Sequence, residues 1–377
     1  MKILFILNGS YSGYSGGDLH TIMVGNQLAS NPNNIVEFYI ASNSSPKILE
    51  MLHEKILLIG NKNLQKRKSQ SILCISVGYS YRILRALMFF LIKKPEYDIA
   101  VASSHFAFDS IPLFAVRNVK SKNIYWHHHV ESVTRSKSPK DLIVMFIEWM
   151  TIKLLRIYDV RVLTSNTVTK QFLLSKGLSG GNVLLTINGL SPYFEIQFAD
   201  GASIEKKPSK SFLFCGRVSL LKGAKDFVSI AESILEFDSD AEFHVIGSEG
   251  DYSNQLLTDL ASEIEQGIVT IHGFVDEETK FRLFKEAHSL IFPSYEEGWG
   301  VTVGEALSTG CWVFVYDLPA VLEAFPNKLE VSKTGDWQSM ARAVKDKIGI
   351  VKDANFDVVP MWRQISEHDL KLFRHYE

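Results

Sequence analysis

The stretch that most constrains the fold of this chain runs from Phe292 to Leu307, Phe-Pro-Ser-Tyr-Glu-Glu-Gly-Trp-Gly-Val-Thr-Val-Gly-Glu-Ala-Leu. An apolar strand is predicted over 289–292, and a helix is predicted after the Gly-Trp-Gly turn. Gly298 and Gly300 allow the backbone to approach a ligand closely, and the helix directs unpaired N–H groups at the same place, which suits a phosphate. The pattern therefore predicts a strand–loop–helix unit with a ligand site at the loop.

Two acidic residues flank this turn with seven residues between them, Glu297 in the loop and Glu305 in the helix. One of them could bind a sugar and the other a ribose. Thr302-Val-Gly-Glu305 also fits a capping box, in which Thr302 caps the helix and Glu305 bonds back to it. Glu297 could instead be a solvated loop carboxylate beside Glu296. Spacing alone leaves both alternatives open.

The nine residues from Glu297 to Glu305 resemble the E-x7-E motif of retaining GT-B glycosyltransferases, above all glycosyltransferase family 4. The preceding Phe-Pro-Ser and the following Ala-Leu-Ser-Thr-Gly310 fit the same family. The resemblance implies an α/β protein of the GT-B fold class, with two Rossmann-like domains facing across a cleft. It also implies donor binding by the four turn residues Gly298, Trp299, Gly300 and Val301.

The length of 377 residues exceeds what a single hydrophobic core usually organises, so two domains are expected. Helical and strand periodicity is lost between Pro192 and Pro208, which we interpret as the linker. The predicted domains are 1–192, on the acceptor side, and 208–358, which binds the nucleotide sugar. A C-terminal helix at about 360–377 resembles the helix that crosses back onto the first domain in this family.

Cysteine usage and apolar runs bear on the compartment. Cys74, Cys215 and Cys311 lack the spacing of a metal or redox site, and so few cysteines favour a reducing compartment such as the cytoplasm. The apolar run at Met1–Leu7 is too short for the core of a signal peptide and is predicted to be a buried first strand. No apolar run approaches the ~18 residues needed to cross a bilayer.

Charge is distributed unevenly along the chain. Basic residues outnumber acidic ones in residues 1–200, and the reverse holds in the remainder. The segment 61–94 has no acid and eight bases, Lys62, Lys66, Arg67, Lys68, Arg82, Arg85, Lys93 and Lys94. This polarity predicts contact between the first half and an anionic surface. The apolar helix predicted over 81–94 has basic residues at its flanks, so it could lie on the inner face of the plasma membrane or pack in the core. The acidic second half argues against nucleic-acid binding.

A glycine-rich loop from Asn8 to Asp18 follows the first strand and leads into a predicted helix, the usual opening of a doubly wound sheet. Its glycines do not match G-x-G-x-x-G, and no Gly-Lys-Ser/Thr follows, so a dinucleotide dehydrogenase and a P-loop enzyme are disfavoured. In family 4 a Gly-Gly pair at this place approaches the donor diphosphate, and Gly16-Gly17 matches it. The alternative is a flexible surface loop.

A strand predicted over 124–126 ends in three histidines, His127, His128 and His129. Side chains alternate along an extended segment, so the three cannot all face one way, and no further Cys/His cluster completes a metal site. The resemblance implies a histidine at the sugar and acceptor end of the cleft. His127 matches that position and is the predicted catalytic histidine, with His128 and His129 as alternatives.

The second half opens with a strand from Ser211 that leads into Gly-Arg217 and then Lys222-Gly. A guanidinium and an ammonium five residues apart around glycines suit a diphosphate, and ordinary surface charge is the alternative. The pattern resembles the G-R-x4-K-G element of the family, so Arg217 and Lys222 are predicted to bind the donor phosphates. The resemblance adds three further donor-binding residues, Gly247, Phe274 and Val275.

The chemistry expected of these residues agrees with the resemblance. Cleavage of a sugar–diphosphate bond builds negative charge on the leaving phosphate, which Arg217, Lys222 and a helix N-terminus would stabilise without a metal or other cofactor. By resemblance, transfer from a nucleotide-diphosphate sugar retains the anomeric configuration, Glu297 orients the sugar and Glu305 holds the ribose. The expected acceptor is a glycan or lipid-linked glycan of a bacterial surface polysaccharide such as O-antigen, capsule or exopolysaccharide.

Two other functions would use a similar chain. A GT-B-like sugar-nucleotide epimerase or phosphorylase would act without a separate acceptor or with inorganic phosphate. A non-catalytic scaffold of the same fold is the alternative from another class. The joint presence of Glu297, Glu305, Arg217 and Lys222 argues against the scaffold, which has no need of all four.

Overall fold

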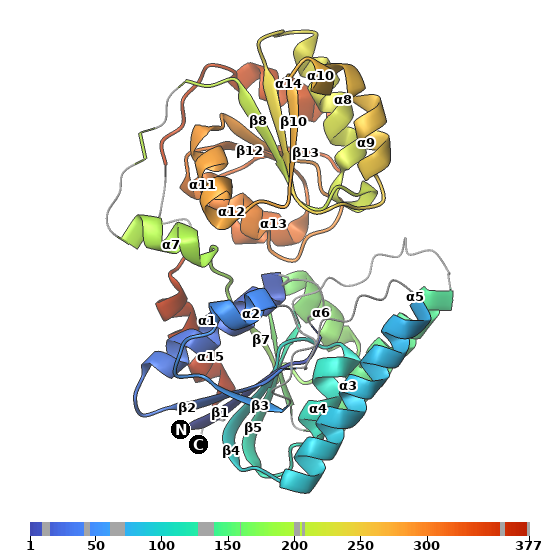
Figure 1. Cartoon of the computed structure of the whole chain (residues 1–377), viewed down its shortest axis with the longest axis vertical. Helices are drawn as coiled ribbons and strands as arrows, with labels where there is room; N and C mark the ends of the chain where they lie inside the picture. The colour runs from blue at the N-terminus through green and yellow to red at the C-terminus, as the bar shows by residue number, and fades with distance from the viewer. Residues whose placement is uncertain are drawn as a thin grey trace. The chain divides into compact units, whose positions relative to one another are not determined.

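The structure is a computed structural model that describes residues 1–9, 16–40, 46–60, 72–126, 139–158, 160–199, 204–205, 208–354 and 359–374. The chain divides into two compact units, each a sheet with helices packed against it (Figure 1). The first unit contains Met1–Asn188 and Met361–Glu377, and the second contains Gly189–Pro360. The α/β class with two Rossmann-like domains, predicted from the sequence, is confirmed.

The first unit has a seven-stranded parallel sheet in the order β3-β2-β1-β4-β5-β6-β7. The strands are short apolar runs, as expected of a parallel sheet that is covered on both faces. They are β1 (Lys2–Leu7), β2 (Ile35–Ile40), β3 (Leu57–Gly60), β4 (Tyr97–Ala102), β5 (Val119–Trp126), β6 (Val160–Thr164) and β7 (Val183–Leu185). The strand order reverses between β1 and β4, where ligands of doubly wound sheets bind.

Helices cover both faces of this sheet. They are α1 (Gly16–Ser30), α2 (Pro46–Met51), α3 (Ile72–Lys93), α4 (Ala107–Ala115), α5 (Pro139–Ile157), α6 (Thr167–Ser175) and α15 (Trp362–Phe373). Side chains of α1, α2 and α15 form a core with one face, and those of α3, α4, α5 and α6 form a core with the other. The C-terminal helix α15 packs against α1 and β5.

The second unit has a six-stranded parallel sheet in the order β10-β9-β8-β11-β12-β13, and this order reverses between β8 and β11. Its strands are β8 (Ser211–Cys215), β9 (Glu242–Ile246), β10 (Val269–Gly273), β11 (Ser289–Phe292), β12 (Trp312–Tyr316) and β13 (Glu330–Ser332). Its helices are α7 (Pro192–Ala199), η1 (Leu220–Lys222), α8 (Ala224–Leu235), α9 (Ser253–Asp259), α10 (Ala261–Glu265), α11 (Glu277–Glu286), α12 (Val301–Ser308), α13 (Pro319–Ala324) and α14 (Trp337–Lys347).

The segment interpreted as a linker begins with a helix. Helix α7 occupies the first eight residues after Ser191, and Phe194 on it is fully buried. The Phe194 ring packs edge-to-face against Phe281 of α11, with 5.0 Å between the ring centroids. The expectation of an irregular segment from Pro192 to Pro208 is therefore wrong over α7, because aromatic packing against the second unit orders it.

Candidate active site

The site in the second unit lies at the edge where β8 and β11 end. The loop after β8 carries Arg217 and Lys222, and the loop after β11 carries Glu297. Because parallel strands end at the same edge of a sheet, these two loops are neighbours. Residues 75 positions apart in sequence are thereby brought into contact.

The ammonium of Lys222 contacts the carboxylate of Glu297. The distance from Lys222 Nζ to Glu297 Oε1 is 2.6 Å, and Nζ also donates to the carbonyl oxygen of Glu296 at 3.0 Å. Ser294 donates to the same Glu297 oxygen at 3.4 Å. Glu297 is therefore an ion-paired, largely buried side chain, and the alternative of a solvated loop carboxylate is wrong.

Gly223 explains how the two loops come so close. Its φ of +74° lies in the left-handed region, and a Cβ at this position would be 1.8 Å from the carbonyl oxygen of Pro293. The backbone N–H of Tyr295 donates to the carbonyl oxygen of Leu221 at 2.9 Å. The glycine of the Lys-Gly pair thus permits the backbone contact that puts Lys222 beside Glu297.

Arg217 lies at the same edge without joining this pair. Its side chain is exposed and makes no hydrogen bond or ion pair with any residue that the structure describes. A cationic side chain in that state can bind an anion without giving up an existing partner. Arg217 and Lys222 therefore differ, because a ligand of Lys222 has to compete with Glu297.

Glu305 lies in α12 and is not part of a capping box. Helix α12 begins at Val301, and its N-cap is Gly300, with φ +90° and no side-chain cap. Thr302 is therefore inside the helix, and the capping-box alternative is wrong. The Glu305 carboxylate is only 1% exposed and lies 2.9 Å from Nζ of Lys280, a residue of α11 that the sequence analysis did not single out.

Lys280 lies between two carboxylates. Its Nζ is 3.1 Å from Glu277 as well as 2.9 Å from Glu305. Burial alone would lower the pKa of the Lys280 ammonium, but the two carboxylates outweigh it and hold that pKa above its ordinary value. Lys280 therefore stays protonated and supplies the countercharge for Glu305.

The other predicted residues of this unit differ in whether their side chains are exposed to a ligand or buried. The Trp299 side chain is 6% exposed and packs against Phe325, so only its backbone could contact a donor. The Val301 side chain packs against the same apolar core, as does that of Val275. Phe274 has 63% of its surface exposed. Gly298 precedes Trp299 in the turn and is partly buried.

Gly247 is a position of close backbone approach. Its φ is +141°, and a Cβ there would lie 1.9 Å from the carbonyl oxygen of Gly216. Its N–H donates to the carbonyl oxygen of Gly273 at 2.8 Å. The glycine is therefore needed to bring the ends of β8, β9 and β10 together, and this packing holds whether or not Gly247 contacts a donor.

In the first unit, Gly16 and Gly17 are the first two residues of α1. A helix N-terminus has unpaired N–H groups that favour an anion, and Gly16 and Gly17 supply such groups. The residues between Gly9 and Gly16 lie outside the described ranges, as do His127, His128 and His129. The predicted role of His127 stays a prediction.

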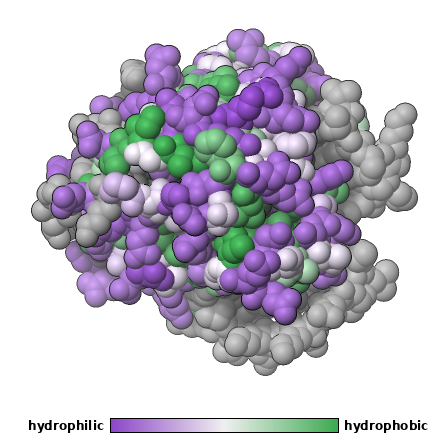
Figure 2. All heavy atoms as spheres, turned by 90° about the horizontal axis from the view of Figure 1, so that it is seen from above, coloured by the Kyte–Doolittle hydropathy of each residue, from purple (hydrophilic) through white to green (hydrophobic). Residues whose placement is uncertain are grey.

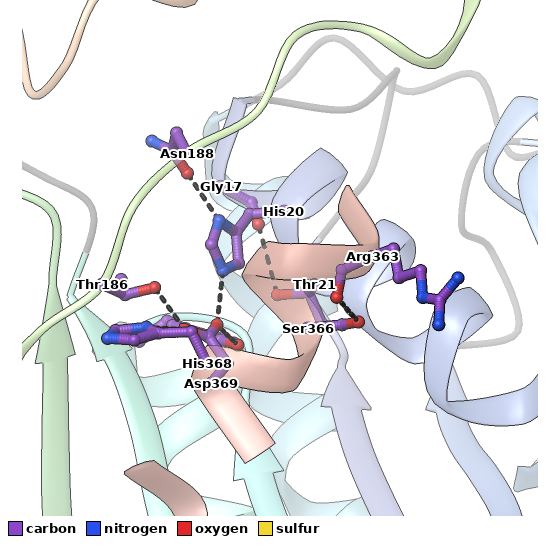
Figure 3. A network of polar contacts seen from close by, with 10 residues as sticks. Gly17, His20, Thr21, Thr186, Asn188, Arg363, Ser366, His368 and Asp369 are labelled. Carbon is purple, nitrogen blue, oxygen red and sulfur yellow. Dashed lines mark hydrogen bonds and ion pairs between the residues drawn. The ribbon is translucent and has the colours of Figure 1, made fainter. Parts of the chain in front are cut away.

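A buried polar network that the sequence did not indicate lies next to these glycines (Figure 3). His20, on α1, contacts Asn188 through Nδ1 at 2.5 Å and Asp369 through Nε2 at 2.8 Å. Thr186 and Tyr125 also donate to the Asp369 carboxylate. An available signal was the apolar stripe of α15, in which Asp369 occupies a core position between buried Ile365 and Phe373.

A second buried acid, Asp109 of α4, joins the ends of β1 and β4. Its carboxylate accepts hydrogen bonds from the Asn8 backbone N–H at 2.6 Å and from the hydroxyls of Ser103 and Ser104 at 2.9 and 2.5 Å. Burial raises the pKa of Asp109 to about 7. This carboxylate fixes the start of the glycine-rich loop to the neighbouring strand.

Helices α3 and α5 expose apolar side chains. Both helices contribute to the same core cluster, yet the face of α3 away from it exposes Leu84, Met88 and Ile92, and α5 exposes Phe146 and Trp149. The face in Figure 2 is mainly hydrophilic, with separated hydrophobic areas. Basic side chains accompany the exposed residues on both helices, namely Arg85, Lys93, Lys153 and Arg156.

One predicted surface base is not on the surface. Arg82 of α3 is 4% exposed and donates to the carbonyl oxygen of Asn8 at 2.9 Å. Its inclusion in a basic surface is wrong, because it satisfies a backbone carbonyl at the end of β1.

None of the helices within the described residues is long and apolar enough to cross a membrane. Within the same residues, no three His, Cys, Asp or Glu side chains are grouped so that they could hold a metal.

Comparison with known proteins identifies the second unit. Residues 196–349 match the sequence model of the family described as "Glycosyl transferases group 1". The second unit is a glycosyl transferases group 1 domain. Arg217, Lys222, Lys280, Glu297 and Glu305 all lie within the matched residues.

Proteins similar to this chain in sequence or in structure include glycosyltransferases. The chain is 28% identical over 158 residues to the uncharacterized glycosyltransferase MJ1607 of Methanocaldococcus jannaschii, a stretch that covers 39% of either protein. Structurally, it resembles WaaG, a glycosyltransferase involved in lipopolysaccharide biosynthesis, with a TM-score of 0.67 at 13% identity over 98% of this chain and 96% of WaaG. It also resembles Anabaena HepE in complex with UDP and glucose, with a TM-score of 0.63 at 15% identity over 99% and 95% of the two chains. The fold is the GT-B fold of these proteins.

Proposed function

We propose that this chain is a retaining, metal-independent glycosyltransferase that moves a sugar from a nucleotide-diphosphate donor to a glycan or lipid-linked acceptor. The observation that carries the proposal is the Lys222–Glu297 pair at the edge of a group 1 domain, together with Arg217 of the same loop as Lys222, whose exposed side chain pairs with none of the described residues. The UDP and glucose bound by HepE support a nucleotide-sugar donor. The lipopolysaccharide role of WaaG supports an acceptor of bacterial surface polysaccharide synthesis.

The proposed reaction assigns each charged residue a step. Arg217 and Lys222 bind the donor diphosphate and stabilise the charge that develops as the sugar leaves. Once a phosphate binds Lys222, the Glu297 carboxylate is released to accept hydrogen bonds from the sugar hydroxyls. Glu305 binds the ribose. His127 orients the sugar or acceptor, and the N-terminus of α1 at Gly16 and Gly17 stabilises the phosphates.

Nucleotide binding is the first test of the proposal. We expect that one of UDP, GDP, ADP and dTDP raises the melting temperature of the chain without added metal. Because a charge-assisted hydrogen bond contributes about 1.5–3 kcal/mol, Arg217→Ala should weaken that nucleotide by about 10–100-fold in a calorimetric titration. Arg342→Ala, which removes an exposed arginine from α14, is the matched control and should bind as the wild type does. Failure of all four nucleotides to bind would contradict the donor site.

The acceptor side is proposed to work at a membrane surface. The exposed apolar side chains of α3 and α5 lie among basic residues, the combination by which peripheral proteins bind anionic lipid. Such binding would bring a lipid-linked acceptor to a chain on the cytoplasmic face of the plasma membrane. The partner proposed for this surface is therefore an anionic bilayer.

Vesicle sedimentation tests the membrane surface. The wild type is expected to sediment with vesicles that contain about 30% anionic lipid and to be released as salt is raised from about 0.1 to 0.5 M. Met88→Glu combined with Ile92→Glu should reduce binding by at least about tenfold, because it removes apolar area that would be buried in the bilayer and adds negative charge that anionic lipid repels. Ile350→Glu, at an exposed apolar residue of the second unit, should have no effect. Equal binding by all three proteins would exclude α3 as the contact.

A further inference from the structure

The Lys280 ammonium is an unusual feature of the second unit. It is a lysine in the first turn of α11, where the N-terminal N–H groups and the helix dipole disfavour a positive charge. Its side chain is 16% exposed, and its Nζ lies 5.4 Å from the centre of the fully buried Phe194 ring. No sequence motif indicated Lys280, because its partner Glu305 is 25 positions away.

Stability alone does not account for this lysine. An ion pair withdrawn from water is often no more stabilising than apolar side chains of similar size, because both charges lose their hydration. The Phe194 ring already lies beside the Lys280 side chain and would pack well against a leucine or methionine. The charged pair of Lys280 and Glu305 is therefore better explained by a role of the Glu305 carboxylate in ligand binding.

We infer that Lys280 is a positioning residue for nucleotide recognition, which holds Glu305 ionised and oriented so that its carboxylate accepts both hydroxyls of a ribose. The inference rests on the proposed function, in which Glu305 binds the ribose. Lys280 contacts Oε1 of Glu305 and is itself held by Glu277 on the same helix. The carboxylate is thus fixed between two helices, α11 and α12, that both begin at the edge where the donor is proposed to bind.

Lys280 would affect ribose binding through the charge state of Glu305. An ionised carboxylate accepts two hydrogen bonds from a cis-diol, whereas the protonated form has a donor in place of one acceptor. Burial raises the pKa of Glu305, and the Lys280 charge opposes this rise. Without Lys280, Glu305 would lose both its orientation and its preference for the ionised form.

The experiment compares ribonucleotides with deoxyribonucleotides. Calorimetry on the full chain would measure UDP against 2′-deoxy-UDP, or the corresponding pair for whichever base binds. We expect the wild type to favour the ribonucleotide by about tenfold. Lys280→Met should weaken the ribonucleotide by about tenfold and the deoxynucleotide by less than about twofold, so that the preference disappears. Lys280→Arg should keep most of it, because a guanidinium preserves the charge.

Two further variants separate this role from a structural one. Glu278→Gln removes a neighbouring exposed acid from the first turn of α11, one that does not contact Lys280, and should leave the ribose preference unchanged. Lys280→Met combined with Glu305→Gln removes both buried charges together, so it should fold even where Lys280→Met alone does not, and it should show no ribose preference.

Four outcomes would overturn the inference. Equal weakening of both nucleotides by Lys280→Met would assign Lys280 a structural role and leave the proposed function standing. Retention of the ribose preference by the double variant, or its absence from the wild type, would overturn the assignment of the ribose to Glu305 and leave the rest of the proposed function standing. A wild type that binds none of the nucleotides would overturn the proposed function together with the inference.

Discussion

Replacing Lys222 by methionine is expected to lower the turnover number for sugar transfer by about 10²–10³-fold. The ammonium of Lys222 is aimed at the loop after β11, where the donor diphosphate is proposed to bind, and a methionine keeps the length of the side chain but stabilises no developing charge. The measurement is the initial rate of nucleoside diphosphate release at saturating donor, with the donor that the binding experiment identifies. A decrease of less than about fivefold would exclude Lys222 from the reaction.

The neighbouring Lys225 provides the matched control. It is an exposed lysine on α8, three residues further along, and Lys225→Met should leave the rate within about twofold of the wild type. Both variants remove one positive charge from the same part of the chain. A difference between them therefore reports the position of the Lys222 ammonium rather than the net charge of the unit.

Glu297→Gln should separate binding from turnover. The Glu297 carboxylate contacts the Lys222 ammonium at 2.6 Å, so it competes with an incoming diphosphate for that ammonium. The amide competes less, and we expect the variant to bind the nucleoside diphosphate several-fold more tightly while its turnover number falls. Weaker binding by Glu297→Gln would contradict the competition between carboxylate and phosphate.

The sequence predicted this part of the site because its residues lie in short contiguous motifs. Arg217 and Lys222 are five residues apart, and the glycines around Lys222 and Glu297 indicated close backbone approach. Gly223 shows the physical basis, since a Cβ there would meet the carbonyl oxygen of Pro293. The order of strands and helices was predictable for the same reason, because each apolar run and each turn is a local signal.

Other parts of the site depend on residues far apart in sequence. The capping-box alternative failed because Gly300, in the left-handed region, begins α12 before Thr302 is reached, which only the backbone conformation reveals. The partner of Glu305 comes from another helix. His20 and Asp369 are 349 positions apart, and no local pattern pairs them. Long-range partners of buried charges follow from the topology and not from spacing.

The buried network of the first unit is expected to contribute several kcal/mol to its stability. His20→Leu leaves the fully buried Asp369 carboxylate without the imidazole that contacts it at 2.8 Å, and the loss of a hydrogen-bond partner from a buried charged group costs about 3 kcal/mol or more. His20→Leu combined with Asp369→Leu removes both groups and should recover much of the loss. Hydrogen–deuterium exchange resolved by peptide is the suitable measurement, because it reports the first unit separately from the second.

The control for this network lies on the same helix. Glu367→Gln changes an exposed acid of α15 that pairs with Arg363 at the surface, at 3.2 Å. Exposed pairs contribute at most about 1 kcal/mol, so exchange in the first unit should barely change. If His20→Leu also leaves exchange unchanged, the network does not hold α1, α15 and the segment before Gly189 together.

The same network predicts how the first unit responds to acid. Burial alone would raise the pKa of Asp369, but the hydrogen bonds from His20, His368 and Thr186 and the electrostatic effect of His20 together outweigh it and hold the pKa below its usual range. A depressed carboxyl pKa stabilises the native state above the unfolded value of about 3.9, and this stabilisation is lost as the pH falls towards the lower folded value. The stability difference between the wild type and Asp369→Asn should therefore be constant near neutral pH and shrink below about pH 4. A difference that instead grew as the pH fell would mean that Asp369 is not the group that the network keeps ionised.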